Sequence, residues 1–220
     1  MKSKLIIIAT TCLVICAFLL SPVLADNAKP IQLPEPRISS GKLLMQALKE
    51  RKTTRKFNNG RLSQQQLSNL LWAAFGVNRP DKGRRTAPSS FNRQEIDIYV
   101  VTADGAYLYD AKAHSLIPVL SEDIRALTGT QGYVKNAAVN LVYVSTPSKM
   151  KQKKVMDRLI ITSANTGFIG QNVYLFCASE GMATVFRDAI DRKKLAEVLK
   201  LKEDQRINFA QSVGAPKSGK

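Results

Sequence analysis

Apolar residues recur along the chain with two different periods, which predicts a mixture of helices and strands. The clearest helix follows Ser63, which forms a capping box with Gln66, and it ends at Gly76. Its apolar residues have the i, i+3, i+4, i+7, i+8 spacing of one helix face: Leu67, Leu70, Leu71, Ala74 and Phe75. At residues 96–101 the period changes to two, which predicts a strand, and Asp104-Gly105 then predicts a hairpin turn.

Shorter patterns of the same kinds predict the remaining elements. Helices are predicted at residues 43–48, 155–179 and 192–199, with a further short helix capped by Ser121. Strands are predicted at residues 107–109, 139–145, 184–186 and 207–213. Because hairpin pairing takes the place of regular β-α-β alternation, these elements predict an α+β layer architecture.

The first 25 residues have the pattern of a secretion signal. A basic start at Lys2 and Lys4 precedes an apolar stretch at residues 5–20, and a Val-x-Ala pattern ends at Ala25. We predict cleavage after Ala25 and an exported mature protein, periplasmic or secreted, without a stable membrane span. The alternative is a retained anchor, since the 16 apolar residues are only slightly fewer than the roughly 17–25 that span a bilayer.

Three prolines, Pro30, Pro34 and Pro36, predict an extended leader over residues 26–40, and residues 41–220 are predicted to form one domain. The 195 residues left after cleavage are enough for a domain with a substantial core. Loss of Lys2 and Lys4 would lower the net charge from +16 to +14. Such a charge favours anionic partners, although most of the lysines and arginines are typical of a solvated surface.

Histidine and cysteine are scarce in this chain. Cleavage would leave Cys177 as the only cysteine, and its apolar surroundings predict a buried, inert thiol. His114 is the only histidine and falls in a predicted loop, so neither a histidine-based metal site nor a Ser-His-Asp triad is expected. We predict no metal.

Three polar stretches carry candidate chemistry. Residues 51–57 place several cations beside hydroxyl groups, a combination that can hold a phosphate. Residues 87–94 offer alternating donors and acceptors suited to the rim of a polar heterocycle. At residues 213–220 a buried strand leads into a basic tail.

Taken in order, these motifs resemble the nitroreductase-like flavoprotein superfamily. They are Arg-x-Thr-x-Arg-x-Phe at residues 51–57, Pro-Ser-Ser-x-Asn-x-Gln at 88–94, Gly-x-x-x-Gln-Asn at 167–172 and Val-Gly-x-Pro at 213–216. The hairpin at residues 105–110 resembles the branch that contains the thiazoline and oxazoline ring-forming dehydrogenases. The resemblance covers about residues 43–217 and implies a nitroreductase-like fold, with a central, mostly antiparallel sheet flanked by helices, in a homodimer.

The resemblance also implies an FMN site in each subunit, in a cleft built from both chains. Arg51 and Thr53 would hold the FMN phosphate and ribityl chain, and Lys217 with Lys220 would approach the same phosphate. Lys52 and Arg55 would lie toward the ring pyrimidine, where a cation stabilises the negative charge that two-electron reduction creates.

Other residues would surround the flavin ring itself. The predicted ring edge consists of Pro88, Ser89, Ser90, Asn92 and Gln94, and the backbone near flavin N5 consists of Met182, Ala183 and Thr184. Hydride or electrons would pass from NAD(P)H, a quinol or a protein to a small organic acceptor, such as a nitro compound, a quinone or a heterocycle. The flavin would carry this chemistry, so the resemblance implies no catalytic acid, base or nucleophile.

Two features depart from the family pattern, and two other functions stay open. Glu95-Ile96 replaces the Pro-Trp of many nitroreductases, and the chain ends only four residues beyond Pro216. A non-catalytic flavin- or anion-binding periplasmic protein with the same fold is one alternative, and a protein that binds anionic polymers is the other. We expect no nucleic-acid partner, because aromatics such as Phe168, Tyr174 and Phe176 are predicted to lie in the core.

Overall fold

The computed structural model describes residues 29–217, so the predicted signal and Lys220 lie outside the described residues. A seven-stranded sheet runs through this part of the chain, and each neighbouring pair of strands is antiparallel. In sheet order the strands are β1 (Ile31–Gln32), β6 (Ser115–Leu120), β5 (Gly105–Asp110), β4 (Ile96–Thr102), β7 (Val139–Ser145), β9 (Arg206–Gly214) and β8 (Ala183–Arg187). The predicted α+β fold is confirmed.

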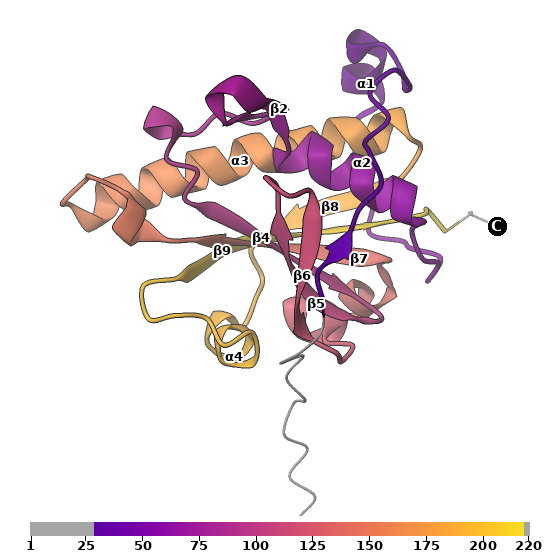
Figure 1. Ribbon diagram of the computed structural model, residues 1–220. Helices are drawn as coiled ribbons and strands as arrows, with labels where there is room; N and C mark the ends of the chain where they lie inside the picture. Colours follow the sequence, from indigo (N-terminus) through magenta and orange to yellow (C-terminus); the bar gives the residue numbers. More distant parts are fainter. Residues whose placement is uncertain (1–28, 218–220) are drawn as a thin grey trace, which may run out of the picture.

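Helices cover both faces of the sheet (Figure 1). The α-helices are α1 (Leu44–Glu50), α2 (Gln64–Phe75), α3 (Val155–Ser179) and α4 (Arg192–Val198). Helices α2 and α3 lie on one face and α4 on the other, while α1 stands beside the C-terminal end of α3 (Figure 1). No helix within residues 29–217 combines the length and apolar character needed to cross a membrane.

Short elements complete the chain. A separate ribbon pairs β2 (Val77–Arg79) with β3 (Arg84–Arg85). Five 3-10 turns occur in the described residues: η1 (Pro80–Lys82), η2 (Ser90–Asn92), η3 (Arg125–Thr128), η4 (Gly132–Asn136) and η5 (Pro147–Lys149).

Strand β7 separates the two main apolar clusters of the core. Leu141 and Tyr143 belong to the cluster beneath α2 and α3, whereas Val142 and Val144 belong to the cluster beneath α4. Successive side chains of a strand point to opposite faces, so a strand covered on both sides needs apolar residues at every position. This requirement explains why its sequence reads as one continuous apolar run.

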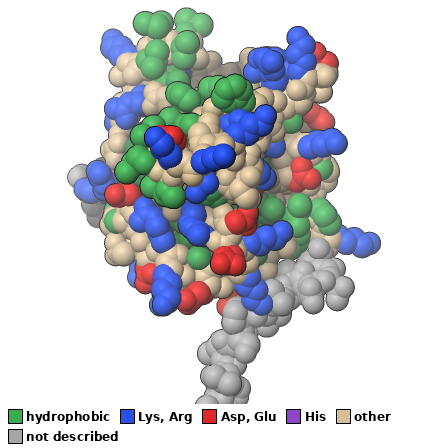
Figure 2. All heavy atoms as spheres, turned by 90° about the vertical axis from the view of Figure 1, so that its left-hand side faces the viewer, with side chains coloured by type: hydrophobic (Ala, Val, Ile, Leu, Met, Phe, Trp, Pro, Cys, Tyr) green, Lys and Arg blue, Asp and Glu red, His purple; other side chains and the backbone are tan. Residues whose placement is uncertain are grey.

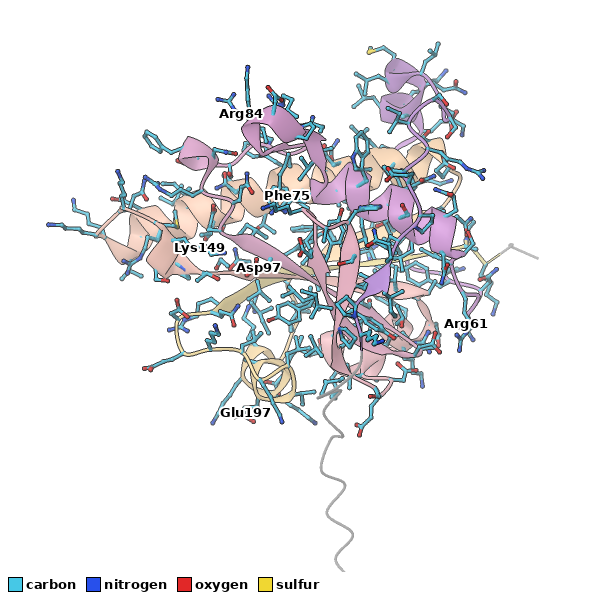
Figure 3. The ribbon with its side chains drawn as sticks, viewed as in Figure 1. Arg61, Phe75, Arg84, Asp97, Lys149 and Glu197 are labelled. Atoms are coloured by element: carbon cyan, nitrogen blue, oxygen red, sulfur yellow. The ribbon has the colours of Figure 1, made fainter. Side chains whose placement is uncertain are left out.

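Helix α2 forms as its sequence predicts. The Ser63 hydroxyl accepts a hydrogen bond from the Gln66 amide, and the Gln66 side chain accepts one from the Ser63 amide. Such a cap contributes about 0.5–2 kcal/mol. Phe75 packs at the end of the helix against the sheet (Figure 3) and is 1% exposed.

The predicted cap at Ser121 was wrong. Ser121 caps no helix: the next helical turn is η3, and its N-cap is Ile124. Here the Asp123 carboxylate accepts from the Arg125 amide and pairs with the Arg125 guanidinium at 2.7 Å, so local side-chain bonds satisfy the backbone in place of a cap. Strand β1 lies within the predicted leader and pairs with β6.

Phe168 was predicted to lie in the core but is 48% exposed. Helix α3 turns a second apolar face away from the sheet, which includes Met156, Ile160 and Phe168. The small residue Gly167 lies on the same face, with no atom within 4 Å of where its Cβ would be. The low polarity of this helix therefore reflects two apolar faces, of which only one is covered within the described chain.

His114 joins the leader to the body of the domain. Its ring nitrogens bond the Ser68 hydroxyl (2.8 Å) and the Tyr109 hydroxyl (2.9 Å), and its carbonyl accepts from the Leu33 amide (3.2 Å). Burial lowers the pKa of His114, although the Pro34 carbonyl and Glu35 oppose this shift. These bonds connect the loop that contains His114 to Ser68 on α2 and to Tyr109 on β5.

Candidate functional site

A cleft of about 620 Å³ opens where α3 ends and β8 begins. It brings together three regions that are far apart in the sequence: the segment after α1, the turn between α3 and β8, and the tail after β9. The predicted site residues that line it are Arg51, Lys52, Met182, Ala183, Thr184 and Lys217.

Backbone hydrogen bonds hold these regions in place. The Thr54 amide donates to the Thr184 carbonyl (2.9 Å), and the Lys217 amide donates to the Lys56 carbonyl (3.1 Å). Phe57 forms a bridge to Pro216 and is only 5% exposed. The aromatic side chain therefore anchors the segment of cations on the sheet edge, and the short tail is fixed beside it.

The cleft is strongly cationic. Its lining contains the cations Lys42, Lys49, Arg51, Lys52 and Lys217, and Glu50 is its one acidic side chain. Glu50 is itself paired with Lys42 at 2.5 Å, and hydrogen bonds from Lys42 and Gln46 lower its pKa. Because this carboxylate is already paired, Lys49, Arg51, Lys52 and Lys217 are left to attract an anion.

The turn between α3 and β8 gives the cleft a backbone wall. Gly181 has a φ of 68°, a conformation that glycine adopts without steric cost. The following Met182 amide closes the helix end by donating to the Cys177 carbonyl (2.8 Å). Strand β8 then starts at Ala183, at the edge of the sheet.

Tyr174 does not line the cleft, but it contacts Arg51, which does, and the sequence did not reveal this contact. It was predicted to be a core aromatic, but it is only partly buried and its hydroxyl lies 2.9 Å from the Thr53 hydroxyl. The Arg51 guanidinium lies 5.2 Å from the centre of its ring. Thr53 does not line the cleft itself, but through Tyr174 it is connected to Arg51, which does. The only available signal was a single polar atom in an apolar helical run.

The loop at residues 88–94 lies away from the cleft. None of its residues lines the cleft. The loop is near the N-terminal end of α3, where Arg93 donates to Gln152 (3.2 Å), whereas α1 is near the C-terminal end (Figure 1). One chain therefore does not bring Pro88, Ser89, Ser90, Asn92 and Gln94 to the cations.

This loop has a strained backbone that its own side chains hold. Phe91, Asn92 and Gln94 have φ values of 53°, 52° and 49°, and each such residue costs on the order of 1–3 kcal/mol. The Gln94 side chain accepts from Arg85 (2.7 Å) and donates to the Gly83 carbonyl (2.7 Å) and to Asn92 (3.0 Å). Gln94 thus uses its amide to shape the loop, while Phe91 projects with 83% of its surface exposed.

Two predicted residues cannot be connected to the cleft. Arg55 is exposed and does not line it, and Lys220 lies outside the described residues. Cys177 touches the cleft but is fully buried, and burial raises the pKa of its thiol. Among residues 29–217, no group of His, Cys, Asp and Glu side chains could hold a metal ion.

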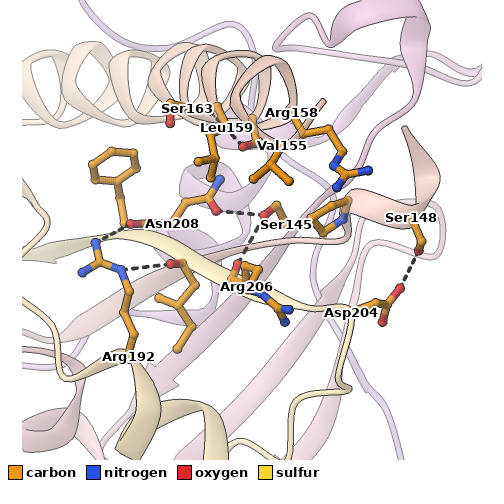
Figure 4. A pocket seen from close by; sticks show the side chains of 14 residues that line it. Ser145, Ser148, Val155, Arg158, Leu159, Ser163, Arg192, Asp204, Arg206 and Asn208 are labelled. Carbon is orange, nitrogen blue, oxygen red and sulfur yellow. Dashed lines mark hydrogen bonds between the residues drawn. The ribbon is translucent and has the colours of Figure 1, made fainter. Parts of the chain in front are cut away.

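A second pocket, of about 660 Å³, lies between α3 and β9 (Figure 4). Arg158, Arg192 and Arg206 line it, but each donates to backbone carbonyls. Asp204 accepts from Ser148 (Figure 4). This pocket contains none of the residues that the motifs predicted, so size alone does not make it the candidate site.

The fold and the cleft define an α+β protein with a cationic site at a sheet edge. The sequence profile of the nitroreductase family matches residues 48–215. A Methanocaldococcus jannaschii protein, provisionally named a nitroreductase, is 30% identical over 183 residues, which are 79% of this chain and 90% of that protein. This chain belongs to the nitroreductase family.

Solved structures agree with this assignment. A Ralstonia eutropha protein, provisionally described as a nitroreductase, is 39% identical with a TM-score of 0.83, covering 90% of this chain and 94% of that one. The NADPH:FMN oxidoreductase of Vibrio harveyi, solved in complex with NAD⁺, is 21% identical with a TM-score of 0.59. It covers 80% of this chain and 69% of that one, and at this identity the likeness shows the fold alone.

Proposed function

We propose that this protein is an FMN-dependent oxidoreductase that passes hydride or electrons from a reductant to a small organic acceptor. The observation that carries the proposal is the cleft in which Arg51, Lys52 and Lys217 meet the backbone of residues 182–184. The cleft volume of about 620 Å³ falls within the 300–1,000 Å³ that is usual for cofactor sites.

The donors of the cleft suit a phosphate monoester joined to a flat, polar ring. Arg51 and Lys217 supply cations for the phosphate, and Lys52 supplies one for an anionic ring edge. FMN, when bound, supplies hydride transfer through its N5 atom, so the protein has to provide position and electrostatic field. The lining supports a cofactor that carries the chemistry itself. Glu50 is paired with Lys42, and burial raises the pKa of the Cys177 thiol, so neither side chain is available as a base or nucleophile.

We further propose that two chains complete the site as a homodimer. The exposed apolar face of α3 contains Met156, Ile160 and Phe168, which are 64%, 61% and 48% exposed. Figure 2 shows hydrophobic side chains among the exposed basic ones on the side of the molecule that faces left in Figure 1. If α3 packed antiparallel to its two-fold mate, the loop at residues 88–94 of one chain would approach the cleft of the other.

Export and the choice of electron donor also belong to the proposal. Nicotinamide cofactors are mainly cytoplasmic, so an exported enzyme would draw on a quinol or an electron-transfer protein in place of NAD(P)H. The NADPH:FMN oxidoreductase of Vibrio harveyi was solved with NAD⁺, which keeps NAD(P)H among the reductants to be tested. Membership of the ring-forming dehydrogenase branch rests on the hairpin motif at residues 105–110.

The experiment is anaerobic reduction of the FMN-loaded mature protein by NADH, NADPH or a soluble quinol, followed by flavin absorbance. The account predicts bleaching by at least one donor and recovery of the absorbance when a quinone or nitro compound is added. The contrary result is a protein that binds FMN but whose flavin none of these donors reduces and dithionite does not reduce reversibly. Such a protein would be a non-catalytic binding protein.

A further inference from the structure

We propose that Tyr174 is a positioning residue that fixes two side chains, the Arg51 cation that lines the cleft and the Thr53 hydroxyl beside it, and so makes the cleft selective for a phosphate monoester. This inference rests on the proposed function, because it concerns the part of the cleft assigned to the FMN phosphate. Its observation is separate: three contacts converge on one partly buried side chain of α3.

The first step concerns the direction of the hydrogen bonds. The Phe186 amide donates to the Tyr174 oxygen at 3.0 Å. A phenol group has one proton to donate in a hydrogen bond. The Tyr174 hydroxyl can therefore donate a hydrogen bond to the Thr53 oxygen, 2.9 Å away. The Thr53 oxygen then accepts, and its own proton is left to point outward.

The second step concerns what that proton would bind. A threonine hydroxyl that already accepts one bond is best satisfied by a partner that only accepts, and phosphate oxygens are such partners. Each bond in the chain from Phe186 through Tyr174 to Thr53 polarises the next, which strengthens the outermost donor. A ribityl hydroxyl could also accept, but it would gain less because it carries no charge.

The third step concerns Arg51. Its guanidinium lies over the Tyr174 ring, 5.2 Å from the centre, where a cation is attracted to the face of the ring. The ring therefore restricts an otherwise flexible side chain and holds its charge at the mouth of the cleft. One aromatic residue thus orders both the donor and the cation before a ligand arrives, which lowers the entropy cost of binding.

The test compares FMN with riboflavin, which has the same ring and ribityl chain but no phosphate. The variants are Tyr174→Phe, which keeps the ring and removes the hydroxyl, and Thr53→Val, which removes the outer donor. Tyr107→Phe is the matched control, since Tyr107 is also partly buried but lies on β5, which β4, β7 and β9 separate from β8. Dissociation constants are measured by flavin fluorescence, and urea midpoints report folding.

Tyr174→Phe and Thr53→Val should each weaken FMN binding by about tenfold, and the double variant should be little worse than either. Riboflavin binding should change less than twofold in all of them, and Tyr107→Phe should leave both ligands unaffected. The inference is overturned if Tyr174→Phe leaves FMN affinity unchanged, or weakens FMN and riboflavin equally.

Failure of the proposed function would look different. In that case the wild-type protein would bind neither flavin, and inorganic phosphate would serve as the probe. Amide chemical shifts of residues 51–54 would then be followed with phosphate in wild type and in Tyr174→Phe. A weaker response in the variant supports the role of Tyr174, and an equal response contradicts it.

Discussion

Substitution of Ile160 by arginine probes the proposed dimer. Ile160 is 61% exposed in the described chain, so Ile160→Arg should leave the fold of a single chain almost unchanged. Full burial of an isoleucine side chain stabilises by about 1.5–3 kcal/mol. Since Ile160 is 61% exposed, its burial on association would contribute roughly 60% of this free energy in each copy. Two copies meet across a two-fold axis, so the lost contact amounts to about 2–4 kcal/mol, or roughly a 30- to 700-fold weaker dimer.

The assay is sedimentation velocity over a dilution series, with FMN absorbance recorded in the same cell. The control is Ile117→Arg on β6, where Ile117 is also exposed, at 38%, but does not belong to α3. The account predicts that Ile160→Arg becomes monomeric at concentrations where wild type and the control are dimers, and that it loses FMN in parallel. A monomeric wild type that keeps stoichiometric FMN, or an Ile160→Arg dimer as tight as wild type, would refute the reasoning.

Five further substitutions test the cleft and the fold. Arg51→Ala should weaken FMN binding about 10- to 100-fold. Arg55→Ala should lower the reduction potential of the flavin while having a smaller effect on FMN binding. Equal reduction potentials in wild type and Arg55→Ala would contradict the predicted role of Arg55. Gly170→Ala places a Cβ 2.6 Å from the Phe186 ring and should cost about 1–3 kcal/mol in urea unfolding, while Gly167→Ala, at an open position, should not. Burial lowers the pKa of His114 in the folded protein, so as the pH falls the unfolded chain is protonated first. The free energy of unfolding should therefore decrease as the pH drops below about 6.5. His114→Gln should reduce this dependence of the unfolding free energy on pH, and an unchanged dependence would contradict the role of His114.

The sequence predicted the regular elements well where a single physical requirement decided them. The bounds of α3 and β7 agree with the predicted ranges because a long apolar helix and a strand buried on both faces leave continuous patterns. The capping box at Ser63 was also predictable, since its bonds lie within three residues. Ser121 failed as a cap because Asp123 and Arg125 satisfied the local backbone instead.

The candidate site was predictable in part. Cations at residues 51–52, the turn at 182–184 and Lys217 were named from motifs, and the fold brings them into one cleft. Tyr174 was missed because its role depends on the register of α3 against β8, which one side chain in an apolar run does not reveal. The apolar face around Phe168 was misread for a related reason: hydropathy shows that a helix has two apolar faces, but not whether its own chain covers both of them.

The central claim is most directly tested by the stoichiometry of FMN in the purified protein. Absorbance of the flavin and of the protein, measured after reconstitution and removal of free FMN, gives the number of cofactors per chain. The account predicts one FMN per chain, with Arg51→Ala losing it on dilution before wild type does. A wild-type protein that stays colourless after repeated reconstitution, while remaining folded, would contradict the account.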